Sequence, residues 1–491
     1  MYKAMASGGT DEGTAMRHAL QLIVLIVLLQ LFVTLLTDGF ALSFDESMWH
    51  YIGRNWFRHG LVPYSGGIDN KSPLIFAVFG LSDSLFGVNY FFPRILGAAV
   101  ESIGIYYLYK IARIVAGERT GILAVSFYGL SLLWHTTGGK YVSYTETYEV
   151  TLIIVAFYYA LNATDRKEMF IGGLTAGIGF WFRITAAFGI VAIFIALLLK
   201  HRRKIIPFCA GVLSGILIIA LICLLAGISF RDLLTYTIID NFGPGSATDH
   251  NLAWRIHNLS AKFLYSGMVL FYLPVLLYIA QKKKIDTLVL WLMFAFIGIN
   301  AVGIYDNVHL KEVLPALSVT SACAITRFAA TYKIFFKAII VIVWIAFLPS
   351  LGEATANLKR LIGVQKDNPV IYCREPYPIP GEGDRKKLGQ WIKANSTRQQ
   401  KVYVAGYGAQ VQAYSERISP TVYFNVTQTA LAKQRFFKDM QANKPDMILV
   451  PLFPEYKQNV DGDICRFVDS LVAKQYTSQG CQFNYAVYRR K

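Results

Sequence analysis

The stretch LQLIVLIVLLQLFVTLLTDGFALSFDESMWHYIGRNW, residues 20–56, decides the fold class of this chain. Its first part, Leu20 to Thr37, is apolar enough to cross a bilayer, which takes about 20 mostly apolar residues. Asp45 and Glu46 then stand side by side, a few residues after the apolar run ends. Because a carboxylate near lipid is costly, this pair is expected either to be solvated or to take part in chemistry.

The composition of the whole chain extends this conclusion. The 491 residues are 54% hydrophobic and only 16% charged. Soluble proteins average about 25% charged residues, so this composition indicates a polytopic α-helical membrane protein. The formal net charge of +17 comes from basic residues that form short clusters between apolar runs. We interpret these clusters as determinants of the orientation of the chain in the membrane, and we expect no nucleic-acid partner.

The basic clusters also decide which apolar runs count as membrane spans. Lys and Arg favour the cytoplasmic side. If the run 73–88 crosses the membrane, every basic cluster falls outside; if it lies on the outer surface, every cluster falls inside. The sequence therefore predicts about eleven transmembrane helices, with the amino terminus inside and the carboxyl terminus outside. The expected spans are residues 18–37, 92–111, 120–136, 148–163, 168–183, 185–200, 205–227, 263–280, 286–304, 310–327 and 334–351.

The chain is expected to contain two domains. Residues 1–352 form the transmembrane domain, with a large first outer loop at 38–91, and residues 353–491 form an extracytoplasmic α/β domain. In this tail the apolar periodicity loosens, and amphipathic helices alternate with short β-branched and aromatic runs. The helices are expected at 384–395 and 427–443, and the strands at KVYVAG (401–406), DMILVP (446–451) and FNYAVYRR (483–490).

The six cysteines do not form a metal-binding pattern. The chain has no CxxC and no Cys/His spacing typical of a metal site. Cys373, Cys465 and Cys481 fall in the tail. If the tail lies outside the cytoplasm, a disulfide between Cys465 and Cys481 is open, and so is the reading in which both stay reduced.

With eleven spans, several polar residues fall at the level of the outer membrane face. A pair of carboxylates near several cations indicates an anionic substrate that is bound while another group loses a proton. Function is therefore expected on the outer side, where the loops are most elaborate. The candidate residues are Asp45, Glu46, Lys71, Arg94, Tyr144, Glu146, Arg183 and His309.

Several short motifs, taken in order, resemble the glycosyltransferases of the GT-C fold. These are the acidic pair 45–46 after the first span, Lys-Ser-Pro-Leu at 71–74, Phe-Pro-Arg at 92–94, Thr-Glu at 145–146 and HLKEVLP at 309–315. Within this fold the chain is similar to the group of protein O-mannosyltransferases and lipid A aminoarabinose transferases. An outer α/β tail is common among its bacterial members, and the resemblance extends over nearly the whole chain.

Two positions depart from the pattern of this group. Ser72-Pro73 stands where the group often has two prolines, and Arg183 stands where its bacterial members often have lysine. Both departures keep the charges, but arginine and lysine present different hydrogen-bond geometries to a phosphate.

The resemblance implies an inverting sugar transfer from a polyprenyl-phosphate donor to a glycan, glycolipid or protein acceptor. The reaction would take place at the outer face of the cytoplasmic membrane, on its periplasmic or extracellular side. It implies Asp45 as the base with Glu46 beside it, Lys71, Arg94 and Arg183 at the donor phosphate, and Glu146, Tyr144 and His309 at the sugar or acceptor, or supporting a divalent cation. The sequence identifies no metal and leaves the need for that cation open.

Other interpretations remain beside this one. Asp45 has the sequence context of a helix N-cap, and Lys71 and Arg94 that of cations at a membrane interface. A transporter or flippase of a lipid-linked sugar is the alternative function. Transporters tend to have repeated halves and polar residues near the midplane, whereas most spans here read as free of charge in their interior, so the enzyme is favoured.

Overall fold

The computed structural model describes residues 12–133, 141–239, 251–265, 269–280, 286–303, 305, 307–328, 352, 354–359, 361–363, 373, 375–425 and 430–491. The chain divides into two compact units. Unit 1 contains Met1–Thr34, Ile95–Ile218 and Leu252–Gly352, and unit 2 contains Leu35–Arg94, Ile219–Asn251 and Glu353–Lys491. Residues 35–94 and 219–251 group with the tail in unit 2, and the division into domains at residue 352 stays a prediction.

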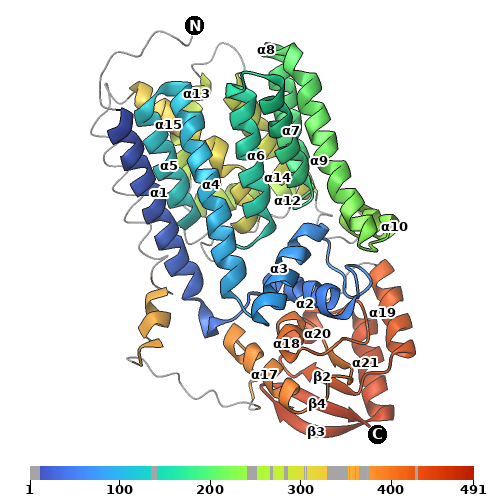
Figure 1. The fold of residues 1–491 in the computed structure, drawn as a ribbon. Helices are drawn as coiled ribbons and strands as arrows, with labels where there is room; N and C mark the ends of the chain where they lie inside the picture. The colour runs from blue at the N-terminus through green and yellow to red at the C-terminus, as the bar shows by residue number, and fades with distance from the viewer. Residues whose placement is uncertain are drawn as a thin grey trace. The chain divides into compact units, whose positions relative to one another are not determined.

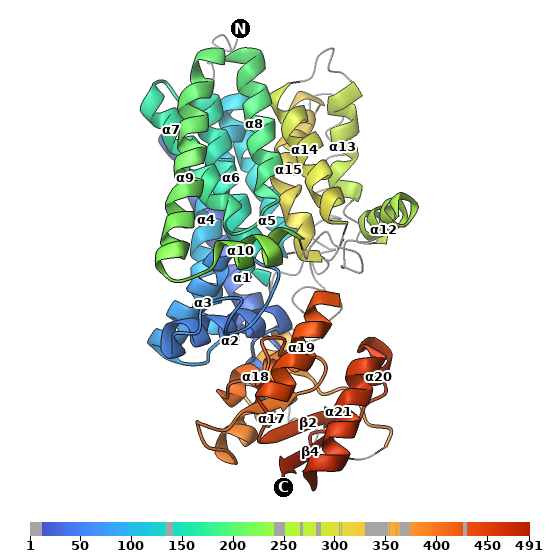
Figure 2. The ribbon, with the colours of Figure 1, turned by 90° about the vertical axis from the view of Figure 1, so that its right-hand side faces the viewer.

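Unit 1 is a helical bundle, in which Figures 1 and 2 show α6, α7 and α9 side by side. Its core consists of buried aliphatic and aromatic side chains contributed by facing helices. The helices are α1 (Glu12–Leu35), α4 (Phe91–Ala116), α5 (Glu118–Leu133), α6 (Thr145–Asn162), α7 (Arg166–Phe180), α8 (Ala186–Lys200), α9 (Ile205–Leu225), α12 (Leu252–Tyr265), α13 (Val269–Ala280), α14 (Thr287–Val302) and α15 (Leu314–Phe328), with the 3₁₀ turn η5 (Asn307–Glu312) before α15. Short turns join several of these helices, as expected for antiparallel neighbours.

Helices α7 and α9 meet backbone to backbone because each carries glycines four residues apart. A Cβ at Gly173 would lie 2.1 Å from the carbonyl oxygen of Phe208, and one at Gly177 would lie 2.3 Å from that of Val212. From the other side, a Cβ at Gly211 would lie 2.1 Å from a carbonyl oxygen of α7. Such small-residue repeats allow close helix packing in membranes, where van der Waals contact replaces the hydrophobic drive.

Among the described residues, three helices are long and apolar enough to cross a membrane by length and composition, namely Met16–Leu35, Phe91–Ala116 and Arg202–Leu225. The predicted surface segment forms α3 (Pro73–Phe86), which has 14 residues and belongs to unit 2. At 1.5 Å per residue it is about 21 Å long, less than a hydrocarbon core of about 30 Å. The expected span 334–351 lies outside the described residues, so the number of eleven spans stays a prediction.

Unit 2 combines the first loop with a small α/β fold in the tail (Figure 1). The sheet has the strand order β1-β2-β4-β3; β1 and β2 are parallel, and the other two pairs are antiparallel. Besides α3, the elements are η1 (Asp38–Phe40), α2 (Phe44–His59), α10 (Phe230–Leu234), η4 (Thr235–Ile239), α17 (Glu382–Ala394), β1 (Val402–Val404), α18 (Ala409–Ser415), α19 (Ala430–Ala442), β2 (Met447–Pro451), α20 (Glu455–Asn459), α21 (Gly462–Gln475), β3 (Tyr476–Gln482) and β4 (Tyr485–Arg490). The α/β tail predicted from the sequence is therefore present.

Both predicted tail helices and all three predicted strands correspond to observed elements, α17, α19, β1, β2 and β4. The sequence did not predict β3 or α21. Strand β3 is mostly exposed and pairs only with β4, so its polar sequence YTSQGCQ has no alternation of buried and exposed side chains to reveal it.

The disulfide left open between Cys465 and Cys481 is absent. Cys481 is instead bonded to Cys373, with 6.0 Å between the two Cα atoms. Cys465 is a free, buried thiol in α21. Its nearness to Cys481 in sequence was misleading, because the partner that reaches Cys481 on β3 lies 108 residues away.

A buried polar cluster joins α2 to α3 in unit 2. His50 is fully buried; its Nδ1 lies 3.6 Å from Asp83 Oδ1, and its Nε2 accepts a 3.4 Å hydrogen bond from the backbone N–H of Asn89. Arg58 also pairs with the Asp83 carboxylate. Burial, together with the charges of Arg54 and Arg58, lowers the pKa of His50 to about 3. His50 is therefore neutral in the folded protein.

The neutral His50 makes the stability of unit 2 depend on pH. A histidine in the unfolded chain has a pKa of about 6.5. Below that pH the unfolded state therefore binds a proton on His50 that the folded state does not bind. The contribution of His50 to stability is thus complete above about pH 6.5 and is lost as the pH falls towards 3. For one proton, the free energy of unfolding should fall by about 1.4 kcal/mol per pH unit in this range.

Thermal unfolding at pH 7, 6 and 5 would measure this slope. In His50→Gln the slope should be reduced, because the group that takes up the proton on unfolding is gone. His257→Gln, at an exposed histidine of α12, is the matched control and should keep the wild-type slope. An unchanged slope in His50→Gln would show that another group causes the loss of stability in acid.

Candidate functional site

The amino-terminal end of α2 presents Asp45. Ser43 is the N-cap: its Oγ accepts from the backbone N–H of Glu46 at 3.5 Å, and its own N–H donates to Glu46 Oε2 at 2.8 Å. This reciprocal arrangement is a capping box. The N-cap role considered for Asp45 is therefore filled by Ser43, and Asp45 lies in the first helical turn, half-buried.

Glu46 forms a buried ion pair with Arg94 from the first turn of α4. Arg94 Nε donates to Glu46 Oε1 at 2.8 Å, and Nη2 donates to Oε2 at 2.5 Å. Neither side chain is more than 1% exposed. The bidentate geometry is the strong form of an arginine–carboxylate pair. It places the predicted cation Arg94 next to the residue that follows Asp45.

The segment that contains Lys71 is hydrogen bonded to α2 through Asp69. The indole nitrogen of Trp49 donates to Asp69 Oδ2 at 2.7 Å, and the backbone carbonyl of Lys71 accepts from Tyr64 Oη at 2.8 Å. Trp49 follows Asp45 by four residues, so both lie on one face of α2. The Lys71 side chain is half-buried and, in the part of the chain that the structure describes, makes no hydrogen bond or ion pair.

The remaining predicted residues lie in unit 1, where Glu146, Arg183 and His309 form one cluster. His309 Nδ1 lies 2.7 Å from Glu146 Oε1 and 3.0 Å from Arg183 Nη2. Arg183 Nη1 pairs with Glu146, and Arg183 Nε lies 2.6 Å from Glu312 Oε1. All are at least nine-tenths buried. Arg183 is thus held between two carboxylates.

Tyr144 is the N-cap residue of α6, one position before its first turn, and is 4% exposed. Its ring lies against that of Tyr141, with 4.8 Å between the centroids. The position next to Glu146 is as the sequence predicted, but the ring is covered by protein. Its stacking on a sugar stays a prediction.

The sequence missed three members of this cluster. Glu312 and Thr185 are hydrogen bonded to each other at 3.0 Å, and both contact Arg183. Glu149, one helical turn after Glu146, is 4% exposed, and its Oε2 has no hydrogen-bond partner among the described residues. The signal was present, because an acidic residue within an apolar run is by default a functional candidate.

A second buried ion pair is an exception to the expectation that most spans are free of charge inside. Lys311 Nζ lies 3.3 Å from Glu101 Oε1, near the middle of α4, and donates to Thr147 Oγ1 at 3.0 Å. Gln30 of α1 donates to the same glutamate. A carboxylate is tolerated inside the bundle here because a cation and an amide satisfy it. Lys311 belongs to the quoted motif 309–315, from which only His309 was predicted.

No group of three or more His, Cys, Asp or Glu side chains arranged to hold a metal is found among the residues that the structure describes. The divalent cation implied by the resemblance thus stays open.

An apolar cavity of about 630 Å³ lies between α12, α13, α14 and α15 in unit 1. Leu273, Leu276, Phe296 and Leu317 are among the side chains that line it. Its lining is almost entirely hydrocarbon, so it suits an acyl or isoprenoid chain better than a polar molecule.

Comparisons with known proteins agree with the resemblance seen in the sequence. The family model described as dolichyl-phosphate-mannose-protein mannosyltransferase matches residues 70–228. This segment contains Lys71, Arg94, Tyr144, Glu146 and Arg183. No curated protein matched the chain at a significant level.

Solved structures share the fold over nearly the whole chain. ArnT from Cupriavidus metallidurans bound to undecaprenyl phosphate is 15% identical, with a TM-score of 0.64 over 96% of this chain and 97% of that chain. The apo state of that ArnT gives a TM-score of 0.63. The archaeal oligosaccharyltransferase AglB from Archaeoglobus fulgidus, in complex with an inhibitory peptide and a dolichol-phosphate, is 11% identical, with a TM-score of 0.51 over 96% of this chain and 74% of that chain.

These matches confirm the predicted resemblance and the predicted fold class. The chain is a multi-pass helical membrane protein of the GT-C type with a small α/β part at its carboxyl end. The matching family model is that of a glycosyltransferase family, and none of the matches reported above is to a flippase.

Proposed function

We propose that this protein is an inverting glycosyltransferase that moves a sugar from a polyprenyl-phosphate donor to an acceptor at the outer face of the cytoplasmic membrane. One observation carries the proposal. Asp45 stands in the first turn of α2 beside the buried Glu46–Arg94 pair, and Trp49 on the same helix face binds the segment that contains Lys71.

The chemistry assigns a role to each of these groups. The acceptor hydroxyl attacks the anomeric carbon, the bond from that carbon to the phosphate oxygen breaks, and polyprenyl phosphate leaves with the electron pair. Asp45 takes the hydroxyl proton late in the attack, because the hydroxyl has a far higher pKa than a carboxylate. Lys71 and Arg94 balance the charge that develops on the leaving phosphate. Glu46 fixes Arg94 through two hydrogen bonds.

The cluster in unit 1 is proposed to serve the sugars. Glu146 and His309 offer hydrogen-bonding groups suited to hydroxyls, and Tyr144 an aromatic ring. Arg183 was predicted at the donor phosphate; because it is already paired with Glu146 and Glu312, we propose that it acts through this network. The apolar cavity between α12 and α15 has the chemistry to hold isoprenoid units of the donor.

Transfer by purified protein in detergent tests the function. In detergent there are no two compartments, so a flippase yields no product, whereas a transferase converts a polyprenyl-phosphate sugar and an acceptor into free polyprenyl phosphate and a new glycoside. Mass spectrometry of outer-surface glycans, glycolipids and glycoproteins, with and without the gene, names the sugar and the acceptor. Absence of any product with every donor found in the host would overturn the proposal.

The proposed sidedness predicts the result of reporter fusions. Alkaline phosphatase folds only outside the cytoplasm, so a fusion after Lys491 should be active. A fusion after Arg203, in the basic turn between α8 and α9, should be inactive because positive residues favour the inside. Activity of the second fusion and not the first would place the tail in the cytoplasm and reverse the topology.

A further inference from the structure

The backbone that leads into α2 is held by side chains from three different elements. We call residues 41–43 the entry strap; they lie in neither a helix nor a strand. The Ala41 carbonyl accepts from Arg94 Nη2 at 3.3 Å, and the N–H of Ser43 donates to Glu46 at 2.8 Å. Between them, the N–H of Leu42 donates to Tyr414 Oη at 2.8 Å, and its carbonyl accepts from Gln410 Nε2 at 2.8 Å.

Both partners of Leu42 come from α18 in the carboxyl-terminal part of unit 2. Gln410 and Tyr414 are four residues apart and therefore share a face of this helix. Leu42 is fully buried, so its two backbone groups depend on these side chains. A buried N–H that loses its only partner is destabilised by the full desolvation of that group. Among the described residues, Gln410 and Tyr414 are the side chains that satisfy the backbone of Leu42.

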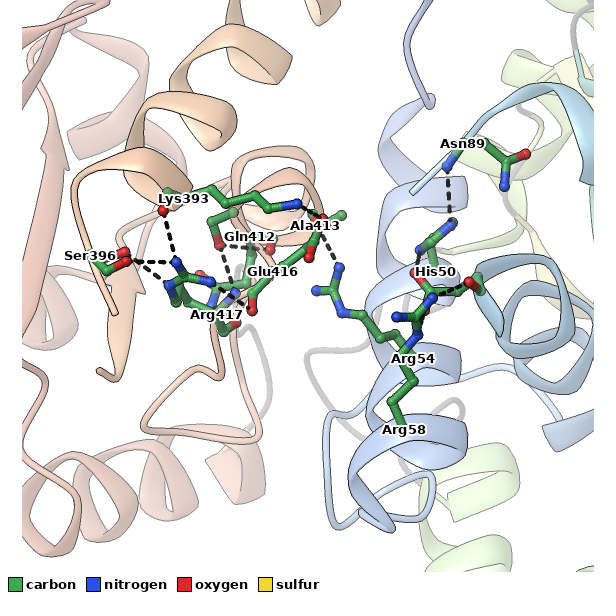
Figure 3. Close-up of polar contacts among 12 residues, drawn as sticks. His50, Arg54, Arg58, Asn89, Lys393, Ser396, Gln412, Ala413, Glu416 and Arg417 are labelled. Carbon is green, nitrogen blue, oxygen red and sulfur yellow. Dashed lines mark hydrogen bonds and ion pairs between the residues drawn. The ribbon is translucent and has the colours of Figure 1, made fainter. Parts of the chain in front are cut away.

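The same helix also binds α2 itself. Arg54 of α2 points to the carboxyl-terminal end of α18 and donates from Nη1 to the carbonyl of Ala413 at 2.7 Å (Figure 3). A cation at this end also meets the negative end of the helix dipole. Within its own fold, α18 is held by Gln412, which donates to the carbonyls of Val402 and Arg417. Helix α18 therefore connects the sheet to the entry strap and to α2.

We propose that Gln410 and Tyr414 are positioning residues that set the place of the Asp45 carboxylate through the entry strap. This inference rests on the proposed transferase function. Asp45 follows Leu42 by three residues and lies in the first helical turn, so a shift of the strap moves the carboxylate by a similar amount. A misplacement of about 1 Å of a reacting group can cost roughly a hundredfold in rate. The carboxyl-terminal fold is then part of the catalytic apparatus.

Steady-state kinetics of full-length Tyr414→Phe and Gln410→Ala in detergent test this role. Each change removes one bond to Leu42, and kcat should fall roughly 10- to 100-fold while the KM for the polyprenyl-phosphate donor changes less than about threefold. Hydrogen–deuterium exchange gives a readout without activity. The peptide that covers residues 41–46 should exchange at least about tenfold faster in either variant.

Gln412→Ala is the matched control, because it removes an amide from the same helix that does not contact the strap. It should lower thermal stability yet leave kcat per folded molecule, and exchange in residues 41–46, near the wild-type values. Full kcat in both Tyr414→Phe and Gln410→Ala would refute the positioning role while leaving the transferase intact. Loss of kcat of the same size in Gln412→Ala would refute it as well, by showing a general effect on the fold. If wild-type protein forms no product, the proposed function fails and the inference falls with it.

Discussion

Asp45→Asn is expected to lower the turnover number for sugar transfer roughly 10²- to 10⁴-fold, the range that general base catalysis contributes. The amide has the size of the carboxylate but is not basic. It therefore cannot accept the proton of the acceptor hydroxyl. Ser43 and Glu46 supply the capping box, so α2 should keep its start and the variant its thermal stability. The measurement is single-turnover transfer with purified, detergent-solubilised protein.

Two comparisons make this result specific. Asp469→Asn, at an exposed aspartate of α21, carries the same chemical change and should turn over at the wild-type rate. Binding of undecaprenyl phosphate should be nearly unchanged in Asp45→Asn, because the cations remain. Wild-type turnover by Asp45→Asn would remove this carboxylate from the mechanism.

Glu46→Gln should destabilise the protein by about 3–5 kcal/mol, the loss that follows when one partner of a buried ion pair is removed. Arg94 is fully buried and would keep its positive charge with no carboxylate against it. The glutamine keeps a hydrogen-bonding group for the capping box. The loss of stability therefore comes mainly from removing the carboxylate charge and not from disturbing the start of α2. Thermal or denaturant unfolding in detergent measures it.

A double-mutant cycle isolates the pair. In Glu46→Gln/Arg94→Met no buried charge is left alone, so the double variant should be more stable than Glu46→Gln. Asp384→Asn is the control; its partner Lys387 is 56% exposed at 3.7 Å, and such a pair contributes at most about 1 kcal/mol. Additive losses in the cycle would mean that the two side chains do not depend on each other.

Features that depend on neighbouring residues in the sequence, such as helix starts and strands, were predicted from local patterns. The start of α2 was predicted, although with Asp45 and not Ser43 as its N-cap, and the strands β1, β2 and β4 correspond to buried aliphatic runs in the sequence. The acidic pair, Lys71 and Arg94 were predicted at one level, and all four belong to unit 2. Their common placement at one membrane face, and their roles there, stay predictions.

Contacts between distant residues were not predictable from pattern. Glu101 and Lys311 are 210 residues apart, and neither residue's neighbours in sequence indicate the other. The same holds for Leu42 and its partners on α18, more than 360 residues away. Each of these polar groups can be buried because a specific partner forms a hydrogen bond or ion pair with it. The identity of that partner follows from the fold and cannot be read from the local sequence.

The bond between Cys373 and Cys481 closes a covalent ring that includes the whole of α18. Disulfides form and persist mainly in oxidising compartments. A reducing agent in a purification buffer would therefore loosen the part of unit 2 that contains α18, on which the entry strap depends. On the proposed function, protein prepared with dithiothreitol should therefore transfer sugar more slowly than protein prepared without it.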